Sequence, residues 1–355
     1  MAETRYYDGT KLLSLMDING EKPEIYMCTS NRNGGKTTYF NRLAVRRFLN
    51  GKGKFALIYR YNYELDDVAD KFFKDIGILF FNNYFMRSER RAKGIYHELF
   101  LCKLDDDPKT GGVSCGYAIA LNNADSIKKL SHLFNDVECM VFDEFQSETN
   151  HYCSKEVKKL ISVHTSIARG RGKQVRYVPI YMMSNPVTLI NPYYVELGIS
   201  SRLNAETKFL RGNGFVLEQG FVESASKAQS NSGFNKAFSK NEYVAYSKEA
   251  VYLNDNTAFI DKPTGKSRYF CTIRYQNADY AVRVFTDLGI IYCDSRADST
   301  HPNKFAITTD DFQINYVILK SNSTIFELLR FYFERGCFRF HDLKCKECIL
   351  TAISY

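Results

Sequence analysis

Short apolar runs and amphipathic segments alternate along the first half of the chain. The apolar runs at residues 25–28, 54–61, 137–142 and 177–183 have the length of strands and lack the polar alternation of a sheet with one solvated face. Apolar positions recur at helical spacing at residues 36–50, 64–76 and 156–167. The pattern therefore predicts a parallel α/β sheet that is buried on both faces.

Other segments follow different patterns. Residues 96–104 and 115–121, joined by a turn rich in Asp and Gly, predict a β-hairpin, and residues 11–16 predict a short helix near the N-terminus. Residues 224–240 are rich in Ser, Asn, Gly and Lys, which is typical of a linker or a mobile small module. Beyond Gly265, four short strands at 269–274, 280–285, 289–293 and 305–308 precede helices at 324–335 and 342–352. We therefore expect three parts: residues 1–222, 223–264 and an α+β domain at 265–355.

Composition narrows the class of protein. The net charge is +8 with a pI of about 8.8, which suits a polyanionic partner. The ten cysteines are scattered through apolar segments, as in a protein of a reducing compartment. We interpret Cys345 and Cys348 as helix-face cysteines, with a zinc site as the alternative. The N-terminus carries no visible signal peptide, and three prolines interrupt the longest uncharged run, so no membrane segment is expected.

Between the first predicted strand and helix lies a phosphate-binding loop of the G-x-x-x-x-G-K-[ST] type, in which Ser30 replaces the first glycine. Gly34 and Gly35 allow a turn whose backbone N–H groups point at phosphate oxygens, at the start of a helix. Lys36 can reach the β- and γ-phosphates, and Thr37 can ligate Mg²⁺. The candidate nucleotide-binding residues are Ser30, Arg32, Asn33, Gly34, Gly35, Lys36, Thr37 and Thr38.

An acidic pair ends the apolar strand at 137–142. Asp143 can hold Mg²⁺ through water, and Glu144 can orient and deprotonate an attacking water molecule. An exposed acidic pair at a strand end is the simpler alternative, but its order after the phosphate loop favours ATP hydrolysis with Mg²⁺ as the metal.

Three further residues are candidates with open alternatives. Asn185, at the end of the next strand, can sense the γ-phosphate or only cap a turn. Arg169 and Arg171 lie on a glycine-flanked loop, which can reach the nucleotide of a neighbouring subunit or remain a solvated basic loop.

The motifs together resemble those of the DNA-encapsidation ATPases of small tailed phages (Picovirinae), relatives of the large-terminase motors. The resemblance covers nearly the whole chain. It rests on the segments 32–37, 59–65, 141–145, 183–185, 191–193 and 308–311. Two positions differ from the family pattern, namely Ser30 in the loop and Asn62 where a lysine is expected.

The resemblance implies a P-loop NTPase domain of the ASCE type, a linker module and an RNase H-like C-terminal domain without cutting activity. It implies a homo-oligomeric ring, expected to be a pentamer, that docks on the portal of a procapsid in the host cytoplasm and drives double-stranded DNA inward. It leaves open whether a packaging RNA takes part. Arg169 matches the trans-acting arginine, with Arg171 as the alternative, and a trans-acting lysine is expected at Lys128 or Lys129.

DNA contact is expected from basic clusters, because phosphate contacts carry no sequence information. Lys128 and Lys129 form one cluster, while Arg87, Arg90, Arg91 and Lys93 form another before the hairpin, for which we slightly favour a solvated basic face. Two rival functions remain: a terminase whose second domain cleaves DNA, and a nucleotide-gated nucleic-acid-binding switch. The carboxylates of the C-terminal part invite the first rival, although we interpret them as turn and cap residues. They are Asp287, Asp294, Asp298, Asp310 and Asp311.

Overall fold

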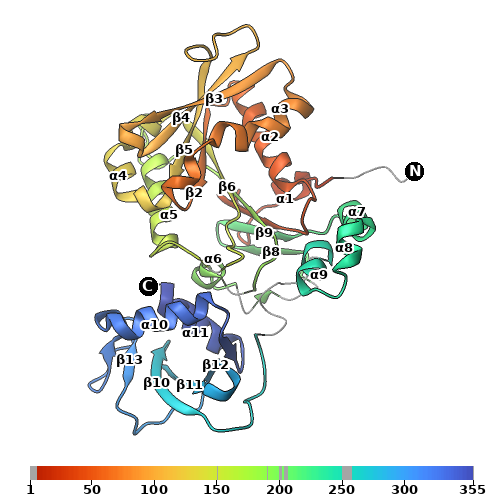
Figure 1. Ribbon diagram of the computed structural model, residues 1–355. Coiled ribbons are helices and arrows are strands. Elements are labelled where there is room, and N and C mark those ends of the chain that lie inside the picture. The colour runs from red at the N-terminus through yellow and green to blue at the C-terminus, as the bar shows by residue number, and fades with distance from the viewer. Residues whose placement is uncertain are drawn as a thin grey trace. The chain divides into compact units, whose positions relative to one another are not determined.

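The computed structural model describes residues 6–149, 151–189, 191–199, 202–203, 207–249 and 258–354. The chain divides into two compact units that interleave along the sequence (Figure 1). The first unit comprises residues 1–145, 156–186 and 205–251, and the second comprises residues 146–155, 187–204 and 252–355. This division differs from the contiguous parts expected from the sequence, and residues 250–257 of the expected linker lie outside the described residues.

A nine-stranded sheet forms the centre of the first unit. Its order is β3-β4-β5-β2-β6-β7-β1-β9-β8. The six strands from β5 to β9 in this order are parallel, and antiparallel strands extend both edges. The strands are β1 (Ile25–Thr29), β2 (Lys54–Tyr59), β3 (Tyr84–Arg91), β4 (Tyr96–Lys103), β5 (Val113–Ala120), β6 (Val137–Asp143), β7 (Ile180–Ser184), β8 (Phe209–Gly212) and β9 (Phe215–Gln219).

Parallel pairing brings the functional motifs to one edge of this sheet. Strand β7 lies between β1 and β6, with Thr29 opposite Ser184 and Asp143 opposite Met183. The loop after β1, the acidic end of β6 and the end of β7 therefore meet where strand carboxyl ends point. In open α/β sheets this edge is the usual place for a ligand.

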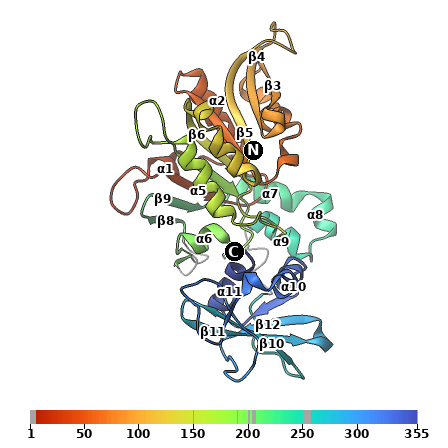
Figure 2. The same ribbon diagram turned by 90° about the vertical axis from the view of Figure 1, so that its left-hand side faces the viewer.

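Helices cover both faces of the sheet, as the apolar strands predicted (Figures 1 and 2). On one face α2 and α3 contribute Phe40, Val45, Phe72 and Phe73 to the core. On the other face α4 packs against α5. The helices of this part are α1 (Thr10–Ser14), α2 (Lys36–Leu49), α3 (Val68–Phe80), α4 (Ala124–Lys129) and α5 (Glu156–Ile167).

Several element boundaries differ from those predicted. The helix expected at 64–76 is a 3₁₀ turn at Asn62–Leu65 followed by α3, because Asp67 adopts a left-handed conformation with φ of 55° and separates them. Strand β7 begins after Pro179, which lacks the N–H that a sheet interior needs. The predicted hairpin is confirmed as β4 and β5, but β3, β8 and β9 were missed.

The Ser- and Asn-rich stretch is helical. It forms α7 (Glu223–Asn231) and α8 (Gly233–Ala237), and α9 (Glu242–Glu249) follows (Figure 1). Composition predicted a linker or a mobile small module because the helices carry few aliphatic residues. Contact between α7 and α9 and burial of Ala225 and Val244 supply the packing that hydrophobic periodicity did not reveal.

The second unit contains a mixed six-stranded sheet. Its order is β14-β13-β10-β11-β12-β15, in which β10, β11 and β12 form an antiparallel meander and the others add in parallel. The C-terminal helix buries Cys345, Cys348 and Ile349 in its core. Its elements are α6 (Pro192–Glu196), β10 (Arg268–Tyr275), β11 (Ala278–Phe285), β12 (Ile290–Asp294), β13 (Lys304–Ala306), β14 (Val317–Ile318), α10 (Ser323–Glu334), β15 (Phe338–Phe340) and α11 (Leu343–Ser354).

Hydrogen bonds explain why two internal segments belong to this unit. The Gln146 side chain accepts the N–H groups of Val187 and Thr188, which fixes one segment to the other. Lys346 of α11 donates to Thr188 Oγ1 at 2.8 Å. None of the described helices is long and apolar enough to span a bilayer.

Candidate active site

Hydrogen bonds to two other segments fix the loop between β1 and α2. Gly35 caps α2 with φ of 92°, a conformation that favours glycine. The Asn31 side chain donates to Val222 O at 3.0 Å and accepts from Val222 N at 2.8 Å, and Tyr7 N donates to Gly34 O at 2.8 Å. These bonds fix the loop to the segment before α7 and to the N-terminal segment.

Ser30 fits the position of the missing first glycine. Its side chain is buried, and its Oγ donates to Asn31 O at 3.3 Å. Lys36 and Thr37 still lie at the start of α2. Serine in place of glycine therefore adds a side chain to the turn without changing the backbone path of the loop.

The Lys36 ammonium group contacts backbone carbonyls of the loop. Its Nζ donates to the carbonyls of Ser30 and Asn31 at 3.0 and 3.2 Å and to Asn185 Oδ1 at 3.2 Å. Burial lowers the pKa of Lys36, whereas the negative charge of Asp143 opposes that change. An ammonium group that bonds three neutral oxygens in a buried position is well placed to receive an anion.

Thr37, Asp143 and Glu144 form a connected set. Thr37 Oγ1 donates to Asp143 Oδ2 at 2.8 Å, and Glu144 N donates to Asp143 Oδ1 at 2.9 Å. The Glu144 side chain is exposed, and its backbone is left-handed with φ of 54°. Hydroxyl and carboxylate oxygens are the ligands that Mg²⁺ prefers, so Thr37 and Asp143 fit that metal.

Burial raises the pKa of the Asp143 carboxyl, although the Thr37 hydrogen bond and the Lys36 charge oppose the shift. Because the pKa of Asp143 is higher in the folded state than in the unfolded state, the free energy of unfolding decreases as pH rises above the unfolded-state pKa. At low pH the carboxyl is protonated in both states, and this cost is absent. Without Mg²⁺, we therefore expect Asp143→Asn to gain stability relative to wild type as pH rises from 4 to 7. Urea unfolding at both pH values measures it; a constant difference would contradict the assignment.

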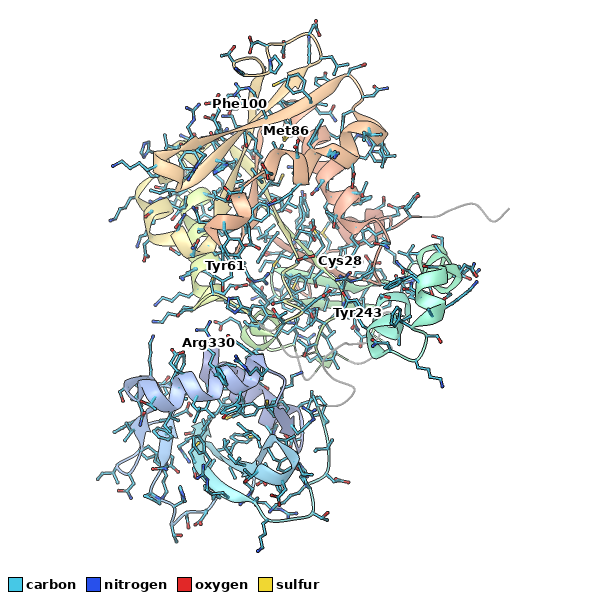
Figure 3. The ribbon with its side chains drawn as sticks, viewed as in Figure 1. Cys28, Tyr61, Met86, Phe100, Tyr243 and Arg330 are labelled. Carbon is cyan, nitrogen blue, oxygen red and sulfur yellow. The ribbon has the colours of Figure 1, made fainter. Side chains whose placement is uncertain are left out.

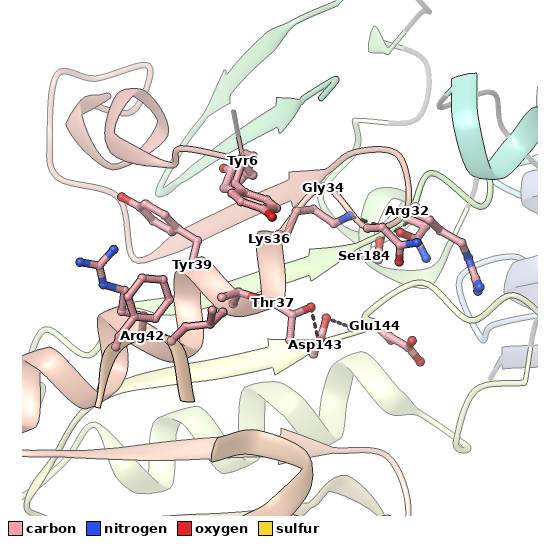
Figure 4. A pocket seen from close by; sticks show the side chains of 17 residues that line it. Tyr6, Arg32, Gly34, Lys36, Thr37, Tyr39, Arg42, Asp143, Glu144 and Ser184 are labelled. Atoms are coloured by element: carbon pink, nitrogen blue, oxygen red, sulfur yellow. Dashed lines mark hydrogen bonds between the residues drawn. The ribbon is translucent and has the colours of Figure 1, made fainter. Parts of the chain in front are cut away.

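One pocket of about 830 Å³ joins most of the predicted residues (Figure 4). Its lining contains Arg32, Asn33, Gly34, Gly35, Lys36, Thr37, Thr38, Asp143, Glu144 and Asn185. This volume is in the range of small-molecule and cofactor sites, and the polar groups converge at the end where Asp143, Glu144 and Ser184 lie. The arrangement suits a nucleoside triphosphate with Mg²⁺.

Sequence reasoning missed the support beneath the acidic pair. Arg60, buried at the end of β2, donates to Glu144 O at 2.7 Å and to Phe145 O at 2.5 Å. Its Nε forms an ion pair with Glu156 of α5 at 3.1 Å. The guanidinium therefore fixes the backbone that holds Glu144 in its left-handed conformation, which makes Arg60 a positioning residue. A charged residue directly after an apolar strand was the available signal.

Removing this cation should destabilise the fold. Arg60 and Glu156 are 8% and 3% exposed, and Arg60→Met would remove the guanidinium that pairs with the buried Glu156 carboxylate. We expect a loss of about 3–5 kcal/mol in the free energy of unfolding. The double variant Arg60→Met/Glu156→Leu should recover most of it in urea unfolding. An equal loss in both variants would show that the charge pair is not the cause.

Arg32 links the loop to the helical module. Its N–H donates to Ser247 O at 3.1 Å, and its guanidinium lies 5.1 Å from the ring centroid of Tyr243 on α9. Tyr243 projects from that helix (Figure 3). The loop arginine therefore lines the pocket and contacts α9 at the same time.

The two candidate trans-acting regions lie side by side. Arg169, which follows α5, donates to Ser131 Oγ at 2.7 Å, and Ser131 is two residues beyond Lys129. Arg169, Lys128 and Lys129 are exposed and lie outside the pocket lining. Arg171 instead forms an ion pair with Glu138 at 2.7 Å. The structure thus leaves Arg169 with a neutral partner and Arg171 with an acidic one.

The second basic cluster is engaged within the sheet. Arg87, Arg90 and Arg91 lie before the hairpin on β3, an edge strand that the sequence did not predict. Arg87 and Arg91 both form ion pairs with Glu89, and Arg91 also pairs with Glu98 at 2.9 Å. Two of the three charges are therefore compensated, which weakens the case for DNA contact.

The C-terminal carboxylates are dispersed among structural roles. Asp294 is buried and forms an ion pair with Arg283 at 3.0 Å, Asp298 caps Thr300, and Asp311 accepts the Asn277 N–H. In the described ranges no group of three His, Cys, Asp or Glu residues could hold a metal ion. Cys345 and Cys348 are buried on α11, consistent with helix-face cysteines.

Known proteins resemble the whole chain. Residues 1–353 match the podovirus DNA encapsidation protein (Gp16) family. The DNA packaging protein of Bacillus phage phi29 is 24% identical over 346 residues, which cover 96% of this chain and 95% of that protein. A chain of the bacteriophage phi29 viral genome packaging motor assembly has a TM-score of 0.54 at 22% identity and covers 95% of both chains. The Phi-28 gp11 DNA packaging motor gives 0.59 at 18% identity over 99% of both. At these identities the two structures establish a common fold.

Proposed function

We propose, because the chain belongs to the podovirus DNA encapsidation protein (Gp16) family, that it is the ATPase that drives double-stranded DNA into a procapsid. One observation carries the enzymatic part: Lys36, Thr37, Asp143, Glu144 and Asn185 line one pocket at the carboxyl edge of a parallel sheet. The placement of β7 between β1 and β6 supports the ASCE type of P-loop NTPase.

The pocket assigns a role to each group in hydrolysis. Lys36 and the loop N–H groups would bind the phosphates, while Asn185 would donate from its amide nitrogen to the γ-phosphate and keep its oxygen on Lys36. Glu144 would accept a proton from water as that water attacks the γ-phosphorus, and ADP and orthophosphate would leave. Mg²⁺, held by Thr37 and Asp143, would neutralise charge on the phosphate oxygens.

Several features support a ring with shared sites. Arg169 is exposed and lies outside the pocket of its own chain, so it would act on the nucleotide of a neighbouring subunit. Lys128 and Lys129, beside it, would contact either that nucleotide or the DNA backbone. A pentamer on the portal, a packaging RNA and transient docking in the host cytoplasm belong to the same proposal and come from the family resemblance.

The C-terminal unit would bind nucleic acid or the portal without cutting DNA. Its antiparallel meander extended by parallel strands is compatible with an RNase H-like sheet. Asp294, the strand-end carboxylate that would be a reasonable metal ligand, is already paired with Arg283, which favours an inactive domain. Nicking of plasmid DNA with Mn²⁺ would instead favour the terminase with an active nuclease.

The proposal is tested by the ATPase rate with and without double-stranded DNA over a range of protein concentrations. Stimulation that rises steeply with concentration would support shared active sites. A DNA-independent turnover near zero, in the presence of procapsids with their portal, would favour the nucleotide-gated switch instead.

A further inference from the structure

The pocket extends beyond the phosphate loop to an end lined by aromatic and apolar side chains. Tyr6, Tyr39, Arg42, Leu79 and Phe80 line it there. Figure 4 shows that Tyr6, Tyr39 and Arg42 lie at the end away from Asp143, Glu144 and Ser184. The exposed fractions of Tyr6, Leu79 and Phe80 are 70%, 62% and 42%. Large apolar side chains therefore face solvent at this end of the pocket.

Arg42 lies over an aromatic ring. Its guanidinium carbon is 4.1 Å from the ring centroid of Phe80, and its Nε is buried without a hydrogen-bond partner. Among the described residues it forms no ion pair, although arginine in proteins commonly binds a carboxylate. The stacked pair from α2 and α3 therefore presents a planar cationic surface to the pocket.

Tyr6 is fixed on the wall formed by the phosphate loop. The neighbouring Tyr7 N–H bonds Gly34 O at 2.8 Å, and a Cβ added at Gly35 would lie 3.4 Å from Tyr6 Cβ. The Tyr6 ring is thereby held beside the turn that binds the phosphates. An aromatic ring and a guanidinium plane thus belong to one pocket, next to the phosphate site.

A planar group covalently attached to a triphosphate is a nucleobase, and aromatic and guanidinium planes bind the π-face of any base. Reading the edge of a base requires polar groups such as carboxylates or amides. The lining residues Tyr6, Tyr7, Thr38, Tyr39, Arg42, Leu79 and Phe80 include hydroxyls but carry no carboxylate and no side-chain amide. This surface can therefore distinguish bases by the area of the ring that stacks on it, and not by the polar groups at the edge of the base.

We infer that Tyr6 and the Arg42–Phe80 pair form a nucleobase-stacking site that favours purine over pyrimidine triphosphates and discriminates little between adenine and guanine. The inference rests on the proposed function, since it identifies which nucleotides that site accepts.

The test is competition against a fluorescent ATP analogue, with ATP, GTP, CTP, UTP and inorganic tripolyphosphate as competitors. We expect CTP and UTP to bind about five- to tenfold more weakly than ATP, and GTP within about threefold of it, as stacking alone would give. Tyr6→Ala and Arg42→Ala should each weaken ATP binding about tenfold and leave tripolyphosphate binding unchanged. Tyr6→Phe should retain ATP affinity.

Arg46→Ala is the matched control, because Arg46 lies one turn further along α2, is exposed and does not line the pocket. Equal affinities for all four nucleotides, or unchanged ATP affinity in both alanine variants, would overturn the inference while tripolyphosphate binding left the phosphate site intact. Failure of tripolyphosphate and of every nucleotide to bind would overturn the proposed function itself.

Discussion

Replacing Glu144 by glutamine should abolish ATP hydrolysis and preserve ATP binding. Glutamine keeps the shape of the side chain and the left-handed backbone that Arg60 supports, but it cannot accept a proton from water. General-base catalysis typically contributes about 10²- to 10⁴-fold, and the turnover number should fall by that factor. Steady-state phosphate release and the affinity for a fluorescent nucleotide measure the two properties separately.

Glu148→Gln serves as the control for this variant, because Glu148 lies four residues further on and does not line the pocket. It should hydrolyse ATP at the wild-type rate. Normal turnover in the Glu144 variant would remove Glu144 from the catalytic assignment, and lost nucleotide binding would indicate a structural role.

Arg169→Ala should inactivate the neighbouring active site and leave nucleotide binding by its own chain unchanged. The reason is placement: the guanidinium bonds the Ser131 hydroxyl, is exposed and lies outside its own pocket. Arginine fingers contribute about 10³- to 10⁵-fold to turnover, so homogeneous variant rings should be nearly inactive. In mixtures with wild type, the activity should fall below the fraction of wild-type chains.

Arg171→Ala is the matched comparison, because Arg171 lies two residues away and is already paired with Glu138. We expect it to retain most of the activity. A linear decline in Arg169 mixtures would argue against action in trans, and a larger effect at Arg171 would exchange the two assignments.

Sequence reasoning was accurate where a local rule determined the structure. The phosphate loop and the acidic strand end were found from spacing, and the parallel sheet from the lack of alternation. Their meeting at one edge followed from the carboxyl ends of parallel strands, as the register of Asp143 with Met183 confirms. The family was also identified correctly from ordered motifs.

The remainder depended on contacts between distant residues. The sequence marks Arg60 only as a charged residue directly after an apolar strand. Its role depends on Glu144 and Glu156, which are 84 and 96 residues away. Strand β9 joins the sheet beside β1 although about 190 residues separate Ile25 from Phe215. The segment of helices α7–α9 was predicted as a linker or small module without secondary structure being assigned, because composition reports local hydrophobicity and not the packing that orders these helices.

Hydrolysis at this site should move double-stranded DNA into a capsid. A packaging assay measures this: purified procapsids that carry their portal, any RNA component of that portal, double-stranded DNA and the protein are incubated with and without ATP, and unprotected DNA is then digested. We expect nuclease-protected DNA only with ATP and wild-type protein, and none with Glu144→Gln. Equal protection without hydrolysis would contradict it, as would a lack of protection under conditions in which the same procapsids stimulate the ATPase.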